Sequence, residues 1–515
     1  MPRTQDSLPD DIEALKALLF AERAARQSAE ITASQERERA DRLEKLLAEL
    51  QRALYGRRSE RLDADQLQLA LEDLESAVAD VEAEREKSAP RPRRRNTNRG
   101  SLPKHLPREE VVIEPETVVC GCGGSLHRIG EDRSERLDVV PARYRVIVTV
   151  RPKYACRACE SGVVQAPAPA RLIEGGMPTE ALVAQVLVNK YADHLPLYRQ
   201  AQIIARQGID LDRSTLADWV GRAAFELQPL FEWLAEHLKS SRKLFMDETP
   251  VPVLDPGRGK TKTGYLWALA RDDRPWGGSD PPGVAYFYAP GRGGIHAQDI
   301  LEGFCGILQV DGYAGYKRLS DPRRSNNPIQ LAHCWAHARR KLYEIAKAGT
   351  APIAEEGLRR IAAIYRIEEE IRGQNPEQRQ TERQARSWPL VEAFEAWVAN
   401  HLARVSGRSR LAEALRYIAK HRDGLTRFLD DGRIEIDSNC VERSIRPIAL
   451  NRKNALFAGH DEGAKNWGTI ASLIETCKLN GVDPQAYLDA TLSRIVAGHQ
   501  QSRIDELMPW AFQEQ

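Results

Sequence analysis

The chain has 515 residues, of which 42% are hydrophobic, and its 75 lysine and arginine residues balance its 74 acidic residues to a formal net charge of +1. This length and apolar content predict several folded domains and exclude a chain that is disordered throughout. Because the net charge is near zero, affinity for a polyanion has to come from local basic patches. No apolar run approaches the roughly 20 residues of a membrane span and no apolar signal core begins the chain, so we expect a cytoplasmic protein without a membrane partner.

Residues 10–87 predict a coiled coil. Between Asp11 and Ala89 there is no proline and one glycine, Gly56, and apolar residues recur at alternating spacings of three and four: Ile12, Leu15, Leu19, Leu43, Leu47, Leu50 and Leu54. The middle of this seam is weaker because it passes through Glu22, Arg26, Ala29, Ala33, Glu36 and Ala40. The pattern favours self-association into a homo-oligomer, and a helical hairpin that folds onto its own chain is the alternative.

Residues 88–110 combine prolines with basic side chains, which are Arg91, Arg93, Arg94, Arg95, Arg99, Lys104 and Arg108. This composition is typical of an extended basic linker. The linker is either a solvated tether or an additional source of salt-dependent phosphate contacts.

Residues 111–172 contain two close pairs of cysteines, Cys120 with Cys122 and Cys156 with Cys159, separated by strand-forming residues. Eight cysteines are too few for a disulfide scaffold in a chain of this length. The two pairs predict a zinc ribbon with a tetrahedral structural Zn²⁺ site, against reduced free thiols as the alternative. Only one residue separates Cys120 from Cys122, so His127 is an alternative ligand in place of one of these sulfurs.

Residues 179–226 predict three helices, from Glu180 to Ala192, from Leu197 to Gln207 and from Asp212 to Ala223. Helical spacing in the third turns Leu216, Trp219 and Val220 inward and Arg213, Thr215 and Asp218 outward. This is the layout of a helix-turn-helix whose last helix reads DNA, with Arg213 and Thr215 as candidate contacts. An ordinary helical bundle is the alternative.

Residues 240–470 alternate strands and helices. We expect strands at Lys243–Val253, Gly264–Ala270, Val284–Tyr288 and Gly306–Val310, with a helix from Ile295 to Phe304 before the last strand. This order brings Asp247 on the first strand next to Asp311 at the end of the fourth. A helical insertion over about 330–425 follows, and the chain then returns with Glu442 on a helix that begins after Asp437-Ser438.

Two strand-end aspartates and one helical glutamate suit a site for two Mg²⁺ or Mn²⁺ ions that cuts phosphodiester bonds, because such ions prefer carboxylate oxygens. The alternative interpretation makes Asp247 and Asp311 strand-end turn residues and Glu442 part of a solvated helix face. Glu248 points to the opposite side of the strand and is not expected to be a ligand.

Basic residues near Glu442 predict a DNA-binding surface. Arg446 lies one helical turn beyond Glu442, where its guanidinium can grip a phosphate, and Arg443, Arg452 and Lys453 extend the same surface. The alternative is a charged helix face with ordinary salt bridges.

A further group, within the insertion, has the spacing of metal ligands on a helix, Cys334 with His337 and His333 with His337. Because no partner pair is evident elsewhere, we interpret these residues as packing or DNA-proximal groups. Residues 471–515 predict a C-terminal helical extension.

The whole chain resembles the large transposase of the insertion sequence 66 family. The motifs that carry the resemblance are Tyr55-Gly56-Arg57-Arg58-Ser59-Glu60, Gly130-Glu131-Asp132, Arg151-Pro152-Lys153-Tyr154-Ala155-Cys156, Met246-Asp247-Glu248-Thr249-Pro250, Val310-Asp311-Gly312-Tyr313, Cys334-Trp335-Ala336-His337-Ala338-Arg339-Arg340, Arg446-Pro447-Ile448-Ala449-Leu450-Asn451-Arg452-Lys453-Asn454, Ser472-Leu473-Ile474-Glu475-Thr476-Cys477 and Pro509-Trp510. Family members often carry an additional cysteine before the first pair, where this chain has Val118 and Val119, so we expect a weaker or differently completed zinc site.

The resemblance implies a multidomain α+β and α/β protein with a coiled coil, a zinc ribbon, a helix-turn-helix and a ribonuclease-H-like DDE catalytic domain that carries the helical insertion. It implies that Asp247, Asp311 and Glu442 are catalytic and hold two Mg²⁺ ions. The implied function is a bacterial, nucleoid-associated DNA transposase that binds terminal inverted repeats and transfers them to target DNA, with small accessory proteins of the element as candidate partners. Two rival functions are a non-catalytic zinc-ribbon and helix-turn-helix DNA-binding protein, derived from a transposase, and a structural zipper protein without DNA affinity.

Overall fold

The computed structural model describes residues 144–155, 163–255, 260–321, 329–455 and 457–513, which all belong to one compact unit, Ala142–Gln515. The predicted coiled coil, the basic linker and the four predicted zinc ligands, Cys120, Cys122, Cys156 and Cys159, lie outside these described residues, as does His127. Within the described ranges, no helix is both long and apolar enough to cross a membrane.

A short antiparallel pair of strands, β1 (Lys153–Ala155) and β2 (Val163–Gln165), begins the described part of the chain. The side chain of Arg151 donates to the carbonyl oxygen of Ala166 at 3.0 Å, and Gln165 donates back to the carbonyl oxygen of Arg151 at 2.9 Å. These two hydrogen bonds hold the base of the pair together.

Three helices follow, α3 (Glu180–Tyr191), α4 (Leu197–Ala205) and α5 (Arg213–Lys239). As predicted, Leu216, Trp219 and Val220 are buried, and Arg213 is exposed. The third helix does not end near Ala223 as predicted but continues to Lys239, through Pro229. Its second half buries Leu227, Leu230, Phe231, Leu234 and Leu238 at helical spacing, and this burial outweighs the hydrogen bond lost at the proline.

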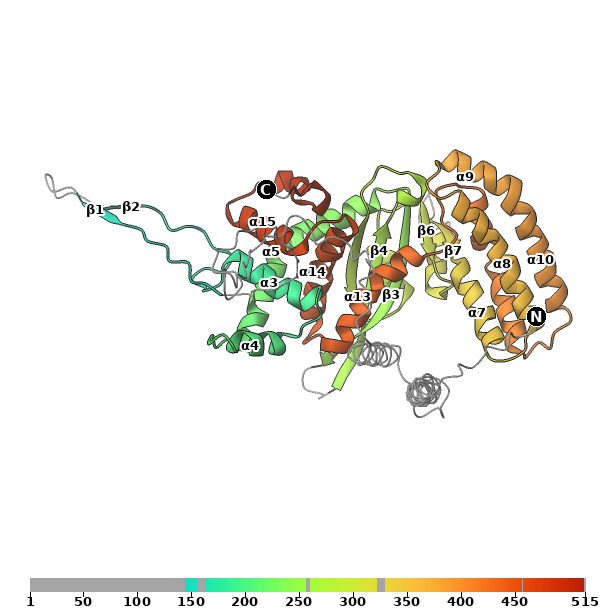
Figure 1. Ribbon diagram of the computed structural model, residues 1–515, viewed down its shortest axis with the longest axis horizontal. Helices are drawn as coiled ribbons and strands as arrows, with labels where there is room; N and C mark the ends of the chain where they lie inside the picture. Colours follow the sequence, from blue (N-terminus) through green and yellow to red (C-terminus); the bar gives the residue numbers. More distant parts are fainter. Residues whose placement is uncertain (1–143, 156–162, 256–259, 322–328, 456, 514–515) are drawn as a thin grey trace, which may run out of the picture. The chain divides into compact units, whose positions relative to one another are not determined.

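A five-stranded mixed sheet, in the order β5-β4-β3-β6-β7, forms the centre of the unit (Figure 1). The antiparallel strands are β3 (Lys243–Asp255), β4 (Lys260–Arg271) and β5 (Gly283–Ala289), and the strands parallel to β3 are β6 (Ile307–Val310) and β7 (Gln330–His333). Helix α6 (Gly294–Ile300) precedes β6. The predicted β-β-β-α-β order is confirmed, but β7 was not predicted, because we expected helices from about residue 330.

Helix α14 (Asp461–Leu479) covers the exposed edge of this sheet at β5. The hydroxyl oxygens of Thr476 and Ser472 accept hydrogen bonds from the backbone nitrogens of Val284 (3.1 Å) and Tyr286 (2.8 Å). A Cβ on Gly468 would lie 2.5 Å from the carbonyl oxygen of Tyr286, so this glycine permits the close approach. These three small residues, four apart on one helix face, therefore satisfy an edge strand that would otherwise expose unpaired backbone groups.

The sheet shares one hydrophobic core with α3, α5, α13 (Asn439–Ala455), α14 and α15 (Pro484–Val496). Helix α14 crosses residue 470, where we had placed the boundary between the catalytic domain and the C-terminal extension. The helix-turn-helix candidate is likewise continuous with this core, and the side chain of Gln485 in α15 donates to the carbonyl oxygen of Ala181 in α3 at 3.2 Å.

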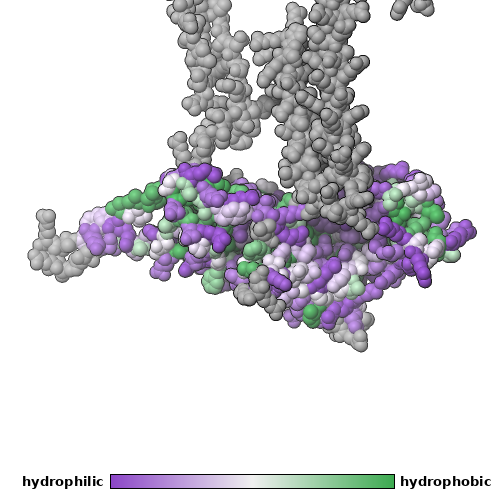
Figure 2. Space-filling view, turned by 90° about the horizontal axis from the view of Figure 1, so that it is seen from below, coloured by the Kyte–Doolittle hydropathy of each residue, from purple (hydrophilic) through white to green (hydrophobic). Residues whose placement is uncertain are grey.

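A second core belongs to the insertion between β7 and α13. Its helices are α7 (Trp335–Lys347), α8 (Pro352–Glu370), α9 (Pro376–Glu382), α10 (Trp388–Leu402), α11 (Arg410–Lys420) and α12 (Arg422–Thr426), with a π-helical turn at Arg383–Ser387. The face shown in Figure 2 is mostly hydrophilic over the described residues, with hydrophobic side chains in separate patches.

Candidate active site

Asp247 and Asp311 lie level with each other on two neighbouring parallel strands, but Asp247 is not at a strand end as predicted, because β3 continues to Asp255 in its pairing with β4. Residues Lys243, Leu244 and Phe245 of β3 pair with Ile307, Leu308 and Gln309 of β6, so the register brings Asp247 level with Asp311, which follows directly after Val310. On its other side, Asp247 pairs with Ala268 of β4. The two apolar runs that precede these aspartates are buried in the sheet, so Asp247 is held within β3 and Asp311 directly after the end of β6.

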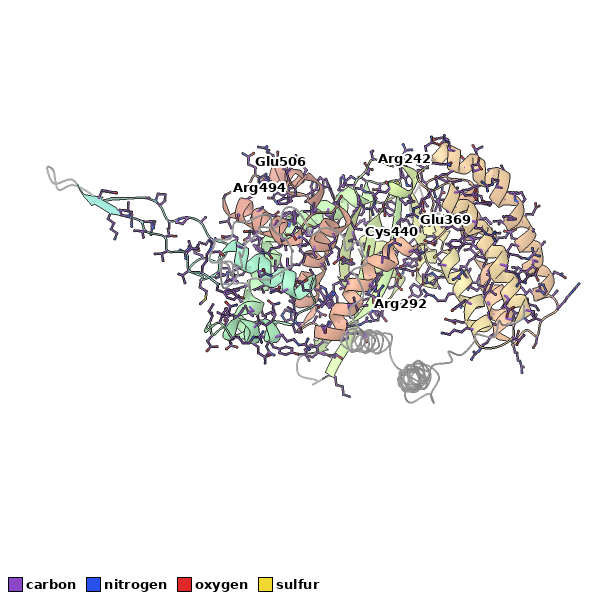
Figure 3. The ribbon with its side chains drawn as sticks, viewed as in Figure 1. Arg242, Arg292, Glu369, Cys440, Arg494 and Glu506 are labelled. Atoms are coloured by element: carbon purple, nitrogen blue, oxygen red, sulfur yellow. The ribbon has the colours of Figure 1, made fainter. Side chains whose placement is uncertain are left out.

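Glu442 comes from the first turn of α13. The helix begins as the sequence predicted: the carboxylate of Asp437 accepts a hydrogen bond from the backbone nitrogen of Asn439 (3.1 Å), and the carbonyl oxygen of Ser438 accepts from the backbone nitrogen of Glu442 (3.2 Å). The tyrosine hydroxyl of Tyr286 in β5 donates to the carbonyl oxygen of Ser444 at 2.5 Å and holds the helix on the sheet. Figure 3 marks Cys440 in this first turn.

The effects that neighbouring charged side chains have on Asp247 come from other carboxylates and not from basic groups. Burial, and after it the negative charges of Glu248, Asp311 and Glu442, raise the pKa of Asp247 to about 7, while a hydrogen bond from the backbone nitrogen of Glu248 opposes the rise. A raised carboxyl pKa means that the ionised form is disfavoured in this environment. The fold therefore brings Asp247, Asp311 and Glu442 into one electrostatic group that a bound cation would stabilise.

Asp311 is fixed by its own turn and by the insertion. Its carboxylate accepts a hydrogen bond from the backbone nitrogen of Tyr313 at 2.8 Å. A Cβ on Gly312 would lie 2.6 Å from the hydroxyl oxygen of Tyr417 in α11, so only glycine allows this contact without a shift. The negative charge of Asp311 contributes, after burial, to raising the pKa of Tyr417 to about 12.

Glu248, the neighbour of Asp247, has separate partners. Its carboxylate accepts hydrogen bonds from Arg292 (2.5 Å) and from the hydroxyl group of Tyr316 (2.6 Å). The guanidinium of Arg292 also lies over the ring of Tyr313, 4.2 Å from its centroid, and Figure 3 marks Arg292 beside the strands. Arg292 and Tyr316 were not identified from the sequence; Arg292 lies in a glycine-rich turn just before α6.

Glu442 also meets two residues of α7, His337, which the sequence analysis interpreted as a packing or DNA-proximal group, and Arg340, for which it proposed no role. Its carboxylate oxygens lie 3.6 Å from Nδ1 of His337 and 3.7 Å from Nη2 of Arg340. Cys334, His337 and Glu442 offer donor atoms that all lie within 4.8 Å of one another. His333 is not part of this group, because its ring packs against that of His421 at 4.9 Å, and burial lowers its pKa to about 4.

The predicted DNA contacts occupy different settings. Arg213, Arg443 and Arg446 are exposed, and Thr215 is half-buried. Arg452 hydrogen-bonds Thr249 Oγ1 at 3.3 Å and the carbonyl oxygen of Pro250, so it holds α13 against β3. Lys453 is half-buried. Contact of any of these side chains with DNA stays a prediction.

Comparison with known proteins gives matches along the chain. Residues 175–466 match the model described as "Transposase IS66 family", residues 472–510 the "IS66 C-terminal element", residues 118–160 the "zinc-finger binding domain of transposase IS66" and residues 42–111 the "Transposase C of IS166 homeodomain". The zinc-finger match spans all four predicted zinc ligands.

Similar full-length chains occur in Sinorhizobium fredii (strain NBRC 101917 / NGR234). Uncharacterized protein y4qI is 47% identical over 528 residues, covering 98% of each chain. Uncharacterized protein y4jD is 46% identical over 521 residues (99% of this chain, 98% of the relative), and y4hP is 38% identical over 489 residues (91% and 88%).

Proposed function

The chain belongs to the IS66 transposase family, and from this premise we propose that it is a DDE transposase that cuts and joins DNA at Asp247, Asp311 and Glu442. The observation that supports this most strongly is the parallel register of β3 and β6, which brings Asp247 level with Asp311; the charges of Asp311 and Glu442 accordingly contribute to the raised pKa of Asp247. Residues far apart in the sequence thus act on one another where two strands and the helix α13 meet.

The carboxylates fit a pair of divalent cations. Mg²⁺ and Mn²⁺ prefer oxygen donors, and three carboxylates without a basic partner at Asp247 have the charge to attract them. When bound, such ions supply Lewis acid chemistry that activates water or a DNA 3′-hydroxyl group and stabilises the leaving 3′-oxygen.

The protein's own residues orient the acidic groups. The backbone nitrogens of Glu248 and Tyr313 each donate to the carboxylate ahead of them, Asp247 at 2.9 Å and Asp311 at 2.8 Å, and so hold one oxygen of each in place. Arg292 and Tyr316 bind Glu248 and keep it from competing as a ligand. This fixed arrangement gives phosphoryl transfer its orientation, and no covalent protein–DNA intermediate is required.

The substrate in this proposal is DNA, namely the terminal inverted repeats of the element and the target. The exposed guanidinium groups of Arg443 and Arg446 follow Glu442 on α13 and would bind phosphates next to the scissile bond. Arg213 and Thr215 on α5 would contact the repeats. The strand order β5-β4-β3-β6-β7 supports a ribonuclease-H-like core, and the zinc-finger match supports a structural Zn²⁺.

Three further elements of the proposal follow from the family and the sequence. The N-terminal coiled coil would join copies of the chain, small accessory proteins of the element would assist, and the protein would act at the bacterial nucleoid.

A cleavage assay with labelled element-end DNA tests the proposal. Wild-type protein with Mg²⁺ or Mn²⁺ is expected to nick the 3′ ends, and Asp247→Asn to lose at least ~10³-fold in rate while it still binds the DNA. Asp299→Asn is the matched control, because Asp299 is an exposed aspartate of α6 outside the carboxylate group. Equal cleavage rates for wild type and Asp247→Asn would overturn the assignment of Asp247, and DNA binding without any metal-dependent cleavage would favour a non-catalytic DNA-binding protein instead.

A further inference from the structure

Cys334, His337 and Glu442 form a second group of metal-binding side chains that shares Glu442 with the candidate active site. Cys334 is the residue directly before α7, His337 lies in the first turn of that helix, and Glu442 lies in the first turn of α13. One donor atom from each side chain lies within 4.8 Å of the other two. The sequence showed the Cys334–His337 spacing, and the fold supplies the third donor from more than one hundred residues away.

The three donors suit a thiophilic cation better than Mg²⁺. A thiolate, an imidazole nitrogen and a carboxylate oxygen are the ligands that Zn²⁺ takes, in a tetrahedron that leaves one position open. Bond lengths of about 2.0–2.3 Å place neighbouring donors in such a tetrahedron roughly 3.3–3.8 Å apart. The 3.6 Å between Nδ1 of His337 and Oε1 of Glu442 falls in that range.

The surroundings of Cys334 support a bound metal. Its sulfur accepts a hydrogen bond from the backbone nitrogen of Ser438 at 3.2 Å, which opposes the rise in the thiol pKa that burial causes. Nδ1 of His337 is buried and has no hydrogen-bond partner among the described residues. The hydrogen bond orients the sulfur as a metal ligand would be oriented, and the ring nitrogen without a hydrogen-bond partner can donate its lone pair to a cation.

A cation can reach the group from one side. Cys334 is only 1% exposed, but the side chains of His337 and Glu442 are 24% and 26% exposed. The nearest positive charge is the guanidinium of Arg340, 3.7 Å from Glu442, and with a side chain 58% exposed it is free to swing into solvent. The sulfur of Cys334 thus lies on the buried side of the group, and a cation from solvent would first meet His337 and Glu442.

We propose that Cys334, His337 and Glu442 bind a divalent cation of the zinc class, and that its occupancy draws Glu442 away from Asp247 and Asp311. The binding itself follows from the three donors alone. The consequence, inhibition of DNA cleavage by Zn²⁺ in the presence of Mg²⁺, rests on the proposed function.

Metal stoichiometry of the full-length protein tests the binding. Wild type, Cys334→Ser, His337→Gln and the control Cys305→Ser are loaded with Zn²⁺, freed of excess metal and analysed for zinc per chain, and the cobalt–thiolate absorption is recorded after loading with Co²⁺. Cys305 is exposed and lies outside the group, so it controls for the loss of a thiol. The predicted zinc ligands Cys120, Cys122, Cys156 and Cys159 are unchanged in all four proteins, so any zinc that they bind is the same in each.

We expect Cys334→Ser and His337→Gln each to bind about one zinc fewer per chain than wild type and Cys305→Ser, with weaker cobalt–thiolate absorption in Cys334→Ser. Unchanged stoichiometry in both variants would show that His337 merely orients Glu442 and would overturn the proposal. Circular dichroism monitors folding, and if the serine variant is unfolded, His337→Gln decides the question.

Cleavage in Mg²⁺ with increasing Zn²⁺ tests the competition separately. Half-inhibition of the His337→Gln variant should need at least tenfold more Zn²⁺ than half-inhibition of wild type. Equal sensitivity would refute the competition. If Asp247→Asn cuts DNA as fast as wild type, the proposed function fails, whereas the zinc stoichiometry still decides whether the site exists.

Discussion

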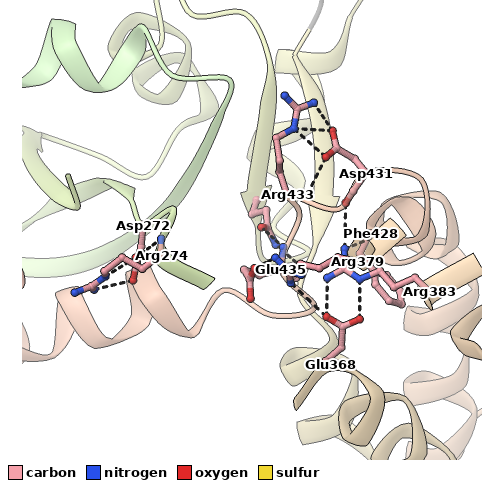
Figure 4. Close-up of polar contacts among 10 residues, drawn as sticks. Asp272, Arg274, Glu368, Arg379, Arg383, Phe428, Asp431, Arg433 and Glu435 are labelled. Atoms are coloured by element: carbon pink, nitrogen blue, oxygen red, sulfur yellow. Dashed lines mark hydrogen bonds and ion pairs between the residues drawn. The ribbon is translucent and has the colours of Figure 1, made fainter. Parts of the chain in front are cut away.

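Two groups of buried charge, one in the insertion and one around Asp247 in the sheet, differ in how that charge is balanced. In the insertion, the guanidinium groups of Arg379 and Arg383 are fully buried and bind Glu368 and Glu435 at distances of 2.6–3.5 Å (Figure 4). Within β3, Asp247 has three carboxylate neighbours, and its pKa is raised. In the first group each guanidinium is paired with a carboxylate, whereas the charges that neighbour Asp247 are negative.

The difference separates a group that stabilises the fold from the group that we propose as the catalytic site. Gln309 connects the two, because its side-chain amide exchanges hydrogen bonds with the backbone of Glu435 at 2.8 and 2.9 Å, two residues before Asp311. The balanced group thereby fixes the strand that carries an unbalanced carboxylate. The proposed metal site is thus supported by a neighbouring group whose own charges are already paired.

The largest expected effect on stability comes from opening the balanced group. Glu368→Gln leaves the buried guanidinium of Arg383 without its carboxylate and should lower the free energy of unfolding by about 3–5 kcal/mol, measured by denaturant unfolding. Glu370→Gln is the control on the same helix, because its ion pair with Arg386 is exposed, and it should change stability little. Equal effects of the two substitutions would contradict the distinction between them.

Asp247→Asn should have a smaller effect of the opposite sign in the absence of divalent cations. The folded pKa of about 7 lies above the ordinary value of 3.8, so the folded state binds the proton more tightly, and this stability is present below pH 4 and lost as pH rises to 7. At pH 8 the asparagine variant should therefore be more stable than wild type by about 2–4 kcal/mol.

Denaturant unfolding of both proteins between pH 4 and pH 8 measures this difference. Parallel pH profiles would show that Asp247 is not an unbalanced carboxylate.

A third comparison concerns two arginines of α13, one bonded within the fold and one exposed. Arg452→Ala removes the hydrogen bonds to Thr249 and Pro250 and should cost about 1 kcal/mol of stability. Arg446→Ala should change the free energy of unfolding by no more than about 0.5 kcal/mol. It should reduce the slope of the logarithm of the DNA-binding constant against the logarithm of salt concentration by about one. Unfolding curves and binding titrations at several salt concentrations separate the two roles, and an unchanged slope for Arg446→Ala would remove it from the DNA surface.

Local patterns in the sequence predicted the parts of the site that local chemistry determines. Apolar runs that end in an aspartate located Asp247 and Asp311, and the N-cap residues Asp437-Ser438 located the helix of Glu442. Strand β7 was not predicted because its four residues, directly before α7, are too few to show the alternation of apolar and polar side chains that indicates a strand. The continuation of α5 beyond Ala223 depends on partners in the sheet and α14, which helical spacing alone does not reveal.

Long-range pairing explains the remaining differences. Nothing near Cys334 and His337 in the sequence indicates that Glu442 will complete their group. Arg379 and Arg383 are buried only because Glu368 and Glu435 arrive from other elements, and such charged side chains are otherwise expected at the surface. Sequence patterns located the ligands of the candidate site, and tertiary packing determined which of them meet.

Binding of Mn²⁺ to the full-length protein, followed by electron paramagnetic resonance, tests most directly whether the unbalanced carboxylates hold cations. Wild type and the control Asp299→Asn should bind Mn²⁺ with the same affinity, and Asp247→Asn should bind it at least tenfold more weakly, because it lacks a ligand oxygen and a negative charge. Equal Mn²⁺ affinity in wild type and Asp247→Asn would contradict a metal site at Asp247, Asp311 and Glu442.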